Sequence, residues 1–161
     1  MGGADQGERC FGRLVADKKK DVYVKTTKRV LVVEDEVLIR MLAVDMLLEF
    51  GYQSDEAGNA AEALKQLQMP GADYGLVFLD IGLPDKRGDD LIKEIRASHS
   101  DLPLLVASGE DQVALKSRLG GFAPIAFLGK PYDSHHFREQ LAILSAIAER
   151  GARLAPSQHS G

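Results

Sequence analysis

Four short apolar segments of the chain each end in a side chain that can do chemistry. Glu34 and Asp35 follow the first segment, Asp80 ends the next, Ser108 ends another, and Lys130 follows the last. The segments are too short for helices, and their unbroken apolar character is typical of strands buried on both faces of a parallel sheet. Because ligands bind beyond the carboxyl ends of such strands, we expect these side chains to converge on one crevice at one edge of the sheet.

These residue types together predict a site for a metal ion and a phosphoryl group. Three carboxylates held close repel one another by about 4 kcal/mol per pair at 4 Å and an effective dielectric constant near 20. A divalent cation relieves that repulsion, and carboxylates, a backbone carbonyl and waters are the ligands that Mg²⁺ takes. The histidines lie away from these strand ends, so a softer metal is not expected there. With a lysine ammonium and a hydroxyl added, Asp80 can act as a nucleophile that forms an acyl phosphate.

Each of these residues, taken singly, also has an ordinary structural explanation. Asp35 and Asp80 can cap a helix or turn the chain, Ser108 is a common turn residue, and Lys130 can be a solvated surface lysine. Their occurrence in order, each at the end of a predicted strand, favours the functional interpretation.

The elements that must position these residues alternate between strands and helices. We expect strands at 30–33, 52–57, 74–80, 103–107 and 124–128, the second of them polar and at the edge of the sheet. Helices are expected at 38–50, 60–68, 111–119 and 134–150, with a further one starting at residue 88 or 89; Gly51 ends the first helix and Asn59 caps the second. Right-handed crossovers place helices on both faces of a parallel sheet, so we predict a doubly wound five-stranded α/β domain.

Length and composition agree with one globular domain. The chain has 161 residues, of which 45% are hydrophobic and 27% charged, and its net charge of -4 gives no indication of nucleic-acid or membrane binding. No bilayer-length apolar run or secretory segment is visible, and a single cysteine allows no internal disulfide, so we expect a cytoplasmic protein. We predict a flexible extension at 1–28, one domain at 29–150 and a disordered tail at 151–161.

The pattern over residues 29–150 resembles the receiver domain of two-component response regulators. The resemblance rests on the acidic pair Glu34-Asp35 and on three motifs, Leu79-Asp80-Ile81-Gly82-Leu83-Pro84, Val106-Ala107-Ser108-Gly109 and Gly129-Lys130-Pro131. It implies a flavodoxin-like (βα)5 fold with strand order 2-1-3-4-5.

The resemblance also implies a role for each residue of the site. Asp80 would be the phosphoacceptor, and Asp35, Asp80 and the backbone carbonyl of Gly82 would ligate Mg²⁺, with Glu34 acting largely through water. Lys130 would pair with the phosphoryl oxygens, and a cis peptide before Pro131 is expected to aim it.

A switch is implied as well. Phosphorylation adds close to two negative charges, and Ser108 can move in to donate a hydrogen bond to them. Phe127, at the position of the family's switch aromatic, would then turn inward, although it could equally be an ordinary core residue. The fourth helix, fifth strand and fifth helix would form the output surface.

By the same resemblance, the phosphoryl group would come from the phosphohistidine of a sensor histidine kinase or a histidine phosphotransfer protein. The chain would act on a downstream protein target or relay the phosphate, as a stand-alone receiver, since no effector domain follows in the sequence. It would be a phosphoacceptor that slowly loses its phosphate and would not be a turnover enzyme.

Two other functions stay open. A pseudo-receiver would bind a partner without being phosphorylated, although the complete acid, Asp80, Ser108 and Lys130 set disfavours it. A Mg²⁺-dependent phosphohydrolase would usually need a second carboxylate as acid or base beside the nucleophile, and Gly82 occupies the position where such a group could lie.

Overall fold

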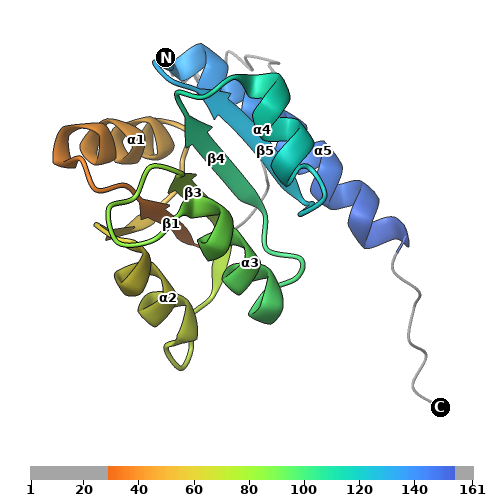
Figure 1. The fold of residues 1–161 in the computed structure, drawn as a ribbon, viewed down its shortest axis with the longest axis horizontal. Coiled ribbons are helices and arrows are strands. Elements are labelled where there is room, and N and C mark those ends of the chain that lie inside the picture. The colour runs from red at the N-terminus through yellow and green to blue at the C-terminus, as the bar shows by residue number, and fades with distance from the viewer. Residues whose placement is uncertain (1–28, 155–161) are drawn as a thin grey trace, which may run out of the picture.

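The computed structural model describes residues 29–154 and contains one five-stranded parallel sheet in the order β2-β1-β3-β4-β5 (Figure 1). The strands are β1 (Arg29–Val33), β2 (Ser54–Ala57), β3 (Tyr74–Asp80), β4 (Leu104–Ser108) and β5 (Ile125–Gly129). The helices are α1 (Val37–Glu49), α2 (Ala60–Gln68), α3 (Gly88–Ser98), α4 (Gln112–Leu119) and α5 (Ser134–Leu154). The predicted fold class and strand order are confirmed. The predictions for residues 1–28 and 155–161 lie outside the described residues.

The sheet separates two apolar cores. Side chains alternate along each strand, so Leu31 and Val33 belong to one core while Val30 and Val32 belong to the other. The first core packs under α2, α3 and α4, and the second packs under α1 and α5. Strands that are apolar on both faces therefore form the centre of the domain, as their uninterrupted apolar runs predict.

Local signals set the helix ends where they were expected. The Asn59 side chain accepts a hydrogen bond from the Glu62 backbone N–H at 2.8 Å and caps α2, and Asp111 caps α4 in the same way through the Ala114 N–H at 2.9 Å. Gly51 follows α1 with a φ of 87°, a conformation that favours glycine.

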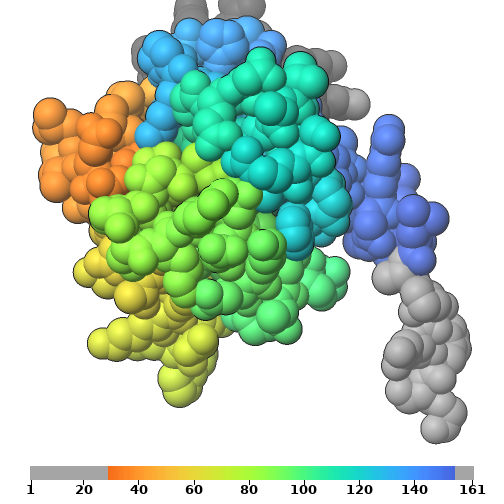
Figure 2. All heavy atoms as spheres, in the orientation of Figure 1, coloured from red at the N-terminus to blue at the C-terminus, as the bar shows by residue number. Residues whose placement is uncertain are grey.

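Two helices differ from the expectation. In α1, Leu38 and Leu42 are 79% and 41% exposed, because the helix is apolar on every side and its periodicity does not show which face is buried. The last helix does not end at Arg150 but continues to Leu154, so the first residues of the predicted disordered tail are helical. In Figure 2 this end of α5 stands away from the body of the domain.

A half-buried arginine, Arg96, joins the connections at the amino-terminal edge of the sheet. The Arg96 guanidinium donates to the carbonyls of His99 (3.0 Å) and Leu102 (2.7 Å) before β4, and to those of Phe122 (2.9 Å) and Pro124 (2.9 Å) before β5. Burial lowers the pKa of Arg96 to about 10, so the group stays charged at neutral pH. One side chain thus satisfies four carbonyls from two loops.

Replacing this arginine by lysine is expected to destabilise the domain. Arg96→Lys keeps the charge but loses the planar fork of donors, which leaves carbonyls without partners. We expect a loss of about 1.5 kcal/mol in the free energy of unfolding, measured by urea denaturation. Arg87→Lys, at an exposed residue whose side chain does not cap α3, is the control. Equal denaturation midpoints for Arg96→Lys and the wild type would contradict the expectation.

Candidate functional site

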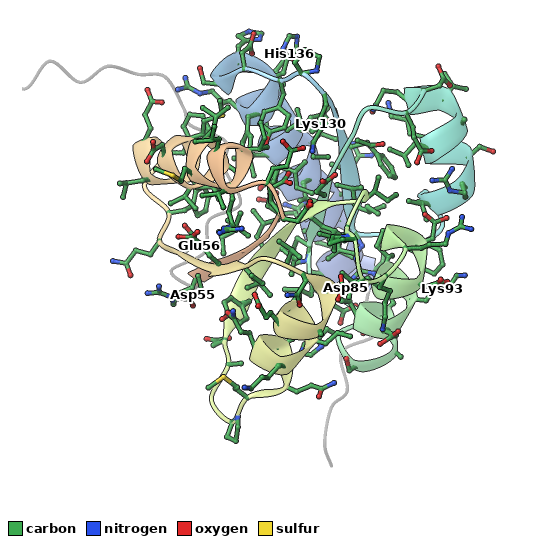
Figure 3. All side chains as sticks on the ribbon, turned by 60° about the vertical axis from the view of Figure 1, so that its left-hand side comes forward. Asp55, Glu56, Asp85, Lys93, Lys130 and His136 are labelled. Carbon is green, nitrogen blue, oxygen red and sulfur yellow. The ribbon has the colours of Figure 1, made fainter. Side chains whose placement is uncertain are left out.

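The predicted site residues meet at the carboxyl-terminal edge of the sheet. Asp80 and Ser108 are the last residues of β3 and β4, and Lys130 directly follows β5. Glu34 and Asp35 lie in the connection between β1 and α1. Figure 3 labels Lys130 among the side chains at this end of the domain. The parallel sheet thus brings together residues that are far apart in the sequence.

Lys130 lies at the centre of the site. Its Nζ is 3.1 Å from Glu34 Oε2 and 3.1 Å from Asp80 Oδ2, so one ammonium bridges two carboxylates. Burial by itself would lower the pKa of Lys130, but the charges and hydrogen bonds of Asp80 and Glu34 outweigh it and raise that pKa. The lysine is therefore a fixed positive charge over the entire physiological pH range.

The acidic cluster carries more charge than the lysine neutralises. Oxygens of Glu34, Asp35 and Asp80 all lie within 4.8 Å of one another. Glu34 is fully buried and Asp80 is 6% exposed, while Asp35 is half-buried and reaches solvent. Three carboxylates against one ammonium leave a net negative site built of oxygen donors, which fits a hard divalent cation such as Mg²⁺.

Opposing effects act on the pKa of the buried Glu34 carboxyl, and the net result is a raised pKa. Burial raises the pKa of Glu34, and the charge of Asp80 raises it further. Hydrogen bonds from the Glu36 backbone N–H, at 3.1 Å to Oε1, and from Lys130 act in the opposite direction but do not cancel the rise. A cation bound at the site would favour the charged form of Glu34.

Arg40 is a positioning residue that the sequence did not single out. Its Nη1 donates to the Glu34 backbone carbonyl at 2.7 Å, and its Nε donates to the Glu56 carboxylate at 2.9 Å. Arg40 thereby ties the turn after β1 to the edge strand β2. The position of Arg40 could have indicated this contact, because an arginine in the first turns of the helix after Glu34 can reach back to the connection that holds Glu34.

The loop after β3 is held by two glycines. The Gly82 N–H donates to Asp80 Oδ1 at 3.2 Å, and the Gly88 N–H donates to the Ile81 carbonyl at 3.2 Å. A Cβ at Gly88 would lie 2.7 Å from the Ile81 Cα, so only glycine allows α3 to approach this closely. Ligation of a cation by the Gly82 carbonyl remains a prediction.

Ser108 and Lys130 are joined through the backbone. The Lys130 N–H donates to the Ser108 carbonyl at 2.8 Å, and the Ser108 hydroxyl accepts from the Glu110 N–H at 3.0 Å. Phe127 is 6% exposed and lies in the core under α2, α3 and α4. The peptide bond between Lys130 and Pro131 is cis, as predicted. The switch roles of Ser108 and Phe127 remain predictions.

Fold and site together define a doubly wound α/β domain with a cluster of three acidic residues and one lysine at the carboxyl-terminal edge of its sheet. Residues 30–142 match the family described as the response regulator receiver domain, and the chain belongs to that family. The predicted resemblance and the assignment to two-component signalling are therefore confirmed.

Individual relatives agree with this assignment. The chain is 34% identical to the sensor kinase CckA of Brucella abortus over 74% of its own length and 13% of that protein. It is 33% identical to the transcriptional regulatory protein PdtaR of Mycobacterium tuberculosis over 83% of its length and 70% of that protein. The chain therefore corresponds to a small part of one relative and to most of the other.

One solved structure with a similar fold contains Mg²⁺ and BeF. The response regulator TrrA of Thermotoga maritima, in complex with Mg²⁺ and BeF, is 32% identical and superposes with a TM-score of 0.63 over 73% of this chain and 98% of that one. Within residues 29–154, none of the helices has the length and apolar character needed to cross a membrane.

Proposed function

We propose that this chain accepts a phosphoryl group on Asp80 from the phosphohistidine of a sensor kinase or phosphotransfer protein, in a Mg²⁺-dependent reaction. The observation that supports it best is the shared lysine, since Lys130 Nζ lies 3.1 Å from both Asp80 and the buried Glu34. The CckA similarity and the Mg²⁺–BeF complex of TrrA point in the same direction. We also propose a cytoplasmic location.

Each residue has a defined role in this reaction. An Asp80 oxygen attacks phosphorus while the bond between phosphorus and the imidazole nitrogen breaks and its electron pair stays on the nitrogen; a proton already on the other ring nitrogen, or one taken from water, makes the leaving group neutral imidazole. Lys130 pairs with the phosphoryl oxygens. Asp35, Asp80 and the Gly82 carbonyl would hold Mg²⁺, with Glu34 acting through water. When bound, the ion neutralises charge on the transferring group. The residues serve one transfer per cycle, so we propose a phosphoacceptor and not a turnover enzyme.

The consequence of phosphorylation is a switch at the ends of β4 and β5. New phosphoryl oxygens would attract the Ser108 hydroxyl away from the Glu110 N–H. The Ser108 backbone carbonyl also accepts a hydrogen bond from the Lys130 backbone N–H, so movement of the end of β4 affects the end of β5. Repacking around the buried Phe127 would carry the change to the surface of α4, β5 and α5, where a downstream protein binds.

The phosphodonor protein would dock on the apolar start of α1. Leu38 and Met41 are 79% and 54% exposed, although leucine and methionine usually lie in cores. Beside them a hollow of about 320 Å³ is lined by residues of α1 and of the connection between β5 and α5: Glu36, Ile39, Leu42, Lys130, Pro131 and Tyr132. This surface adjoins the site, so a protein seated on it can present a histidine to Asp80.

A negative charge introduced on this surface should slow phosphorylation by a donor protein but not phosphorylation by a small donor. Leu38→Glu is expected to slow transfer from a phosphorylated donor protein at least about tenfold, since a carboxylate enters a desolvated contact. Phosphorylation by acetyl phosphate should stay within about twofold of the wild type. Val113→Glu is the control, because Val113 is also exposed and apolar but lies on α4 and not on α1. Equal slowing of both donors would place the effect in the site itself.

The central test is intact mass after incubation with acetyl phosphate, with and without Mg²⁺. One added phosphoryl group, dependent on Mg²⁺ and labile to hydroxylamine, is expected. Continued turnover of small phosphomonoesters without a stable adduct would favour a phosphohydrolase. Neither adduct nor turnover would favour a pseudo-receiver that binds partners constitutively.

A further inference from the structure

An arginine on α4 joins the two chain segments that follow the reactive ends of β3 and β4. Arg118 lies in the last turn of α4, and its guanidinium contacts Glu110, in the connection between β4 and α4, and Asp89, in the first turn of α3. Figure 1 shows α3 and α4 on the same face of the sheet. One side chain therefore links the segment after Asp80 to the segment after Ser108.

Both contacts have the paired geometry in which arginine binds carboxylates most strongly. Toward Asp89, the Arg118 Nε lies 2.7 Å from Oδ2 and Nη2 lies 3.3 Å from Oδ1. Toward Glu110, Nη1 lies 2.9 Å from Oε2 and Nη2 lies 3.3 Å from Oε1. Single ion pairs at a surface contribute little to stability, but paired hydrogen bonds from one guanidinium to two carboxylates do contribute. Arg118 thus fixes the position of Glu110.

The position of Glu110 affects the Ser108 hydroxyl. The Glu110 backbone N–H donates to Ser108 Oγ at 3.0 Å. In the proposed reaction the hydroxyl leaves this N–H and bonds the new phosphoryl oxygens instead. The side chain of Glu110 is bound to Arg118 while its backbone holds Ser108, so the two ion pairs and the Ser108 hydrogen bond belong to the same arrangement of the connection between β4 and α4.

We propose that Arg118 is a positioning residue that opposes the movement of Ser108 toward the phosphorylated site. Its ion pairs stabilise the arrangement in which Ser108 bonds the Glu110 N–H, and Glu110 moves away from Arg118 when Ser108 leaves. This inference rests on the proposed phosphorylation of Asp80 and adds to it a regulating residue outside the site. A contact made only in the unphosphorylated state weakens binding of a phosphoryl group by its own free energy, so its removal should strengthen that binding.

The test measures binding of beryllofluoride, a tetrahedral analogue of the phosphoryl group, to the full chain in excess Mg²⁺ by titration calorimetry. Arg118→Gln is expected to bind the analogue about threefold more tightly than the wild type, because the mutation removes a contact of surface ion-pair strength. Loss of a positive charge would by itself weaken binding of an anion, so a purely electrostatic effect would have the opposite sign.

Arg29→Gln is the matched control for the loss of an arginine ion pair. Arg29, at the start of β1, also binds a carboxylate in the paired geometry, with Nε 2.7 Å and Nη2 2.6 Å from the oxygens of Asp55. Both residues lie on β1 and β2, away from the connection between β4 and α4. We expect Arg29→Gln to bind beryllofluoride with wild-type affinity.

A second background shows whether the effect acts through Ser108. Ser108→Ala lacks the hydroxyl that accepts from the Glu110 N–H, so the position of Glu110 no longer affects the bound analogue by this route. Combined with Ser108→Ala, the change Arg118→Gln should leave the affinity for beryllofluoride unchanged, and the double-mutant cycle then measures the coupling between the two residues.

The outcomes separate this inference from the proposed function. Wild-type chain that binds no beryllofluoride in excess Mg²⁺ would overturn the proposed function and the inference together. Where the wild type binds, equal or weaker binding by Arg118→Gln would overturn the inference alone. The same tightening in Arg29→Gln, or in the Ser108→Ala background, would also overturn it. Tighter binding by Arg118→Gln only where Ser108 is present would support it.

Discussion

Asp80→Asn is expected to accept no phosphoryl group from any donor, with or without Mg²⁺, while folding normally. The amide has nearly the shape of the carboxylate but is not a nucleophile and ligates a cation poorly. Lys130 keeps its bond to Glu34, so the site does not lose its internal ion pair. Removal of one charge from a cluster of three carboxylates should leave the unfolding midpoint unchanged or raised. Intact mass and thermal denaturation measure the two effects.

The control for this substitution lies a few residues further along the same loop. Asp85 also follows β3, but its carboxylate accepts from the backbone N–H groups of Ala60 and Ala61, both at 3.0 Å, at the start of α2. In Figure 3 it stands apart from Lys130. These hydrogen bonds lower the pKa of Asp85. Asp85→Asn should weaken the cap of α2 and still take up one phosphoryl group. An adduct on Asp80→Asn would show that another residue is the acceptor.

Lys130→Met is expected to have the second largest effect, on both chemistry and stability. Loss of the ammonium that stabilises the transferring group should slow phosphorylation by acetyl phosphate about a hundredfold or more. It also leaves the fully buried Glu34 without its countercharge, and breaking a buried pair costs roughly 3 kcal/mol. Phosphorylation kinetics and urea denaturation at pH 7 measure the two losses.

The stability loss should depend on pH in a defined direction. The pKa of Glu34 is already raised, and removing Lys130, which acts to lower it, raises it further. A carboxyl with a raised pKa in the folded state binds its proton before the unfolded chain does as the pH falls. The deficit of Lys130→Met should therefore shrink from pH 7.5 to pH 5.5. Lys93→Met, at a surface lysine that pairs with Asp90 at 3.3 Å and with no other described residue, should show neither the deficit nor its pH dependence.

The site was predictable from the sequence because its residues interrupt apolar runs. A carboxylate, hydroxyl or ammonium that directly follows a buried strand must lie at the strand's end, and a parallel sheet places those ends together. The closeness of Lys130 to Glu34 and Asp80 follows from that geometry, whereas its contacts with both at 3.1 Å are a finding of the structure. The helix caps were equally local, as Asn59 shows.

Other features could not be predicted because they depend on tertiary packing. The apolar residues of α1 surround the whole helix, so nothing in their spacing showed that Leu38 would face outward. Arg96 has the appearance of an ordinary basic residue near a helix end, and only the fold brings four carbonyls to it. Tyr132 differs from phenylalanine by one oxygen, whose enclosure appears only in three dimensions.

The arginine that gathers four loop carbonyls has a consequence for how this domain can diversify. It secures β4 and β5 at the edge opposite Asp80, so the anchoring of these strands does not depend on the residues that carry out the chemistry. Substitutions in the loops at the edge that carries Asp80 therefore leave these four hydrogen bonds in place, whereas Lys130 itself also contributes to stability through its pair with the buried Glu34. An engineer who exchanges the loops around Asp80 between relatives should leave Arg96 and its carbonyl partners untouched.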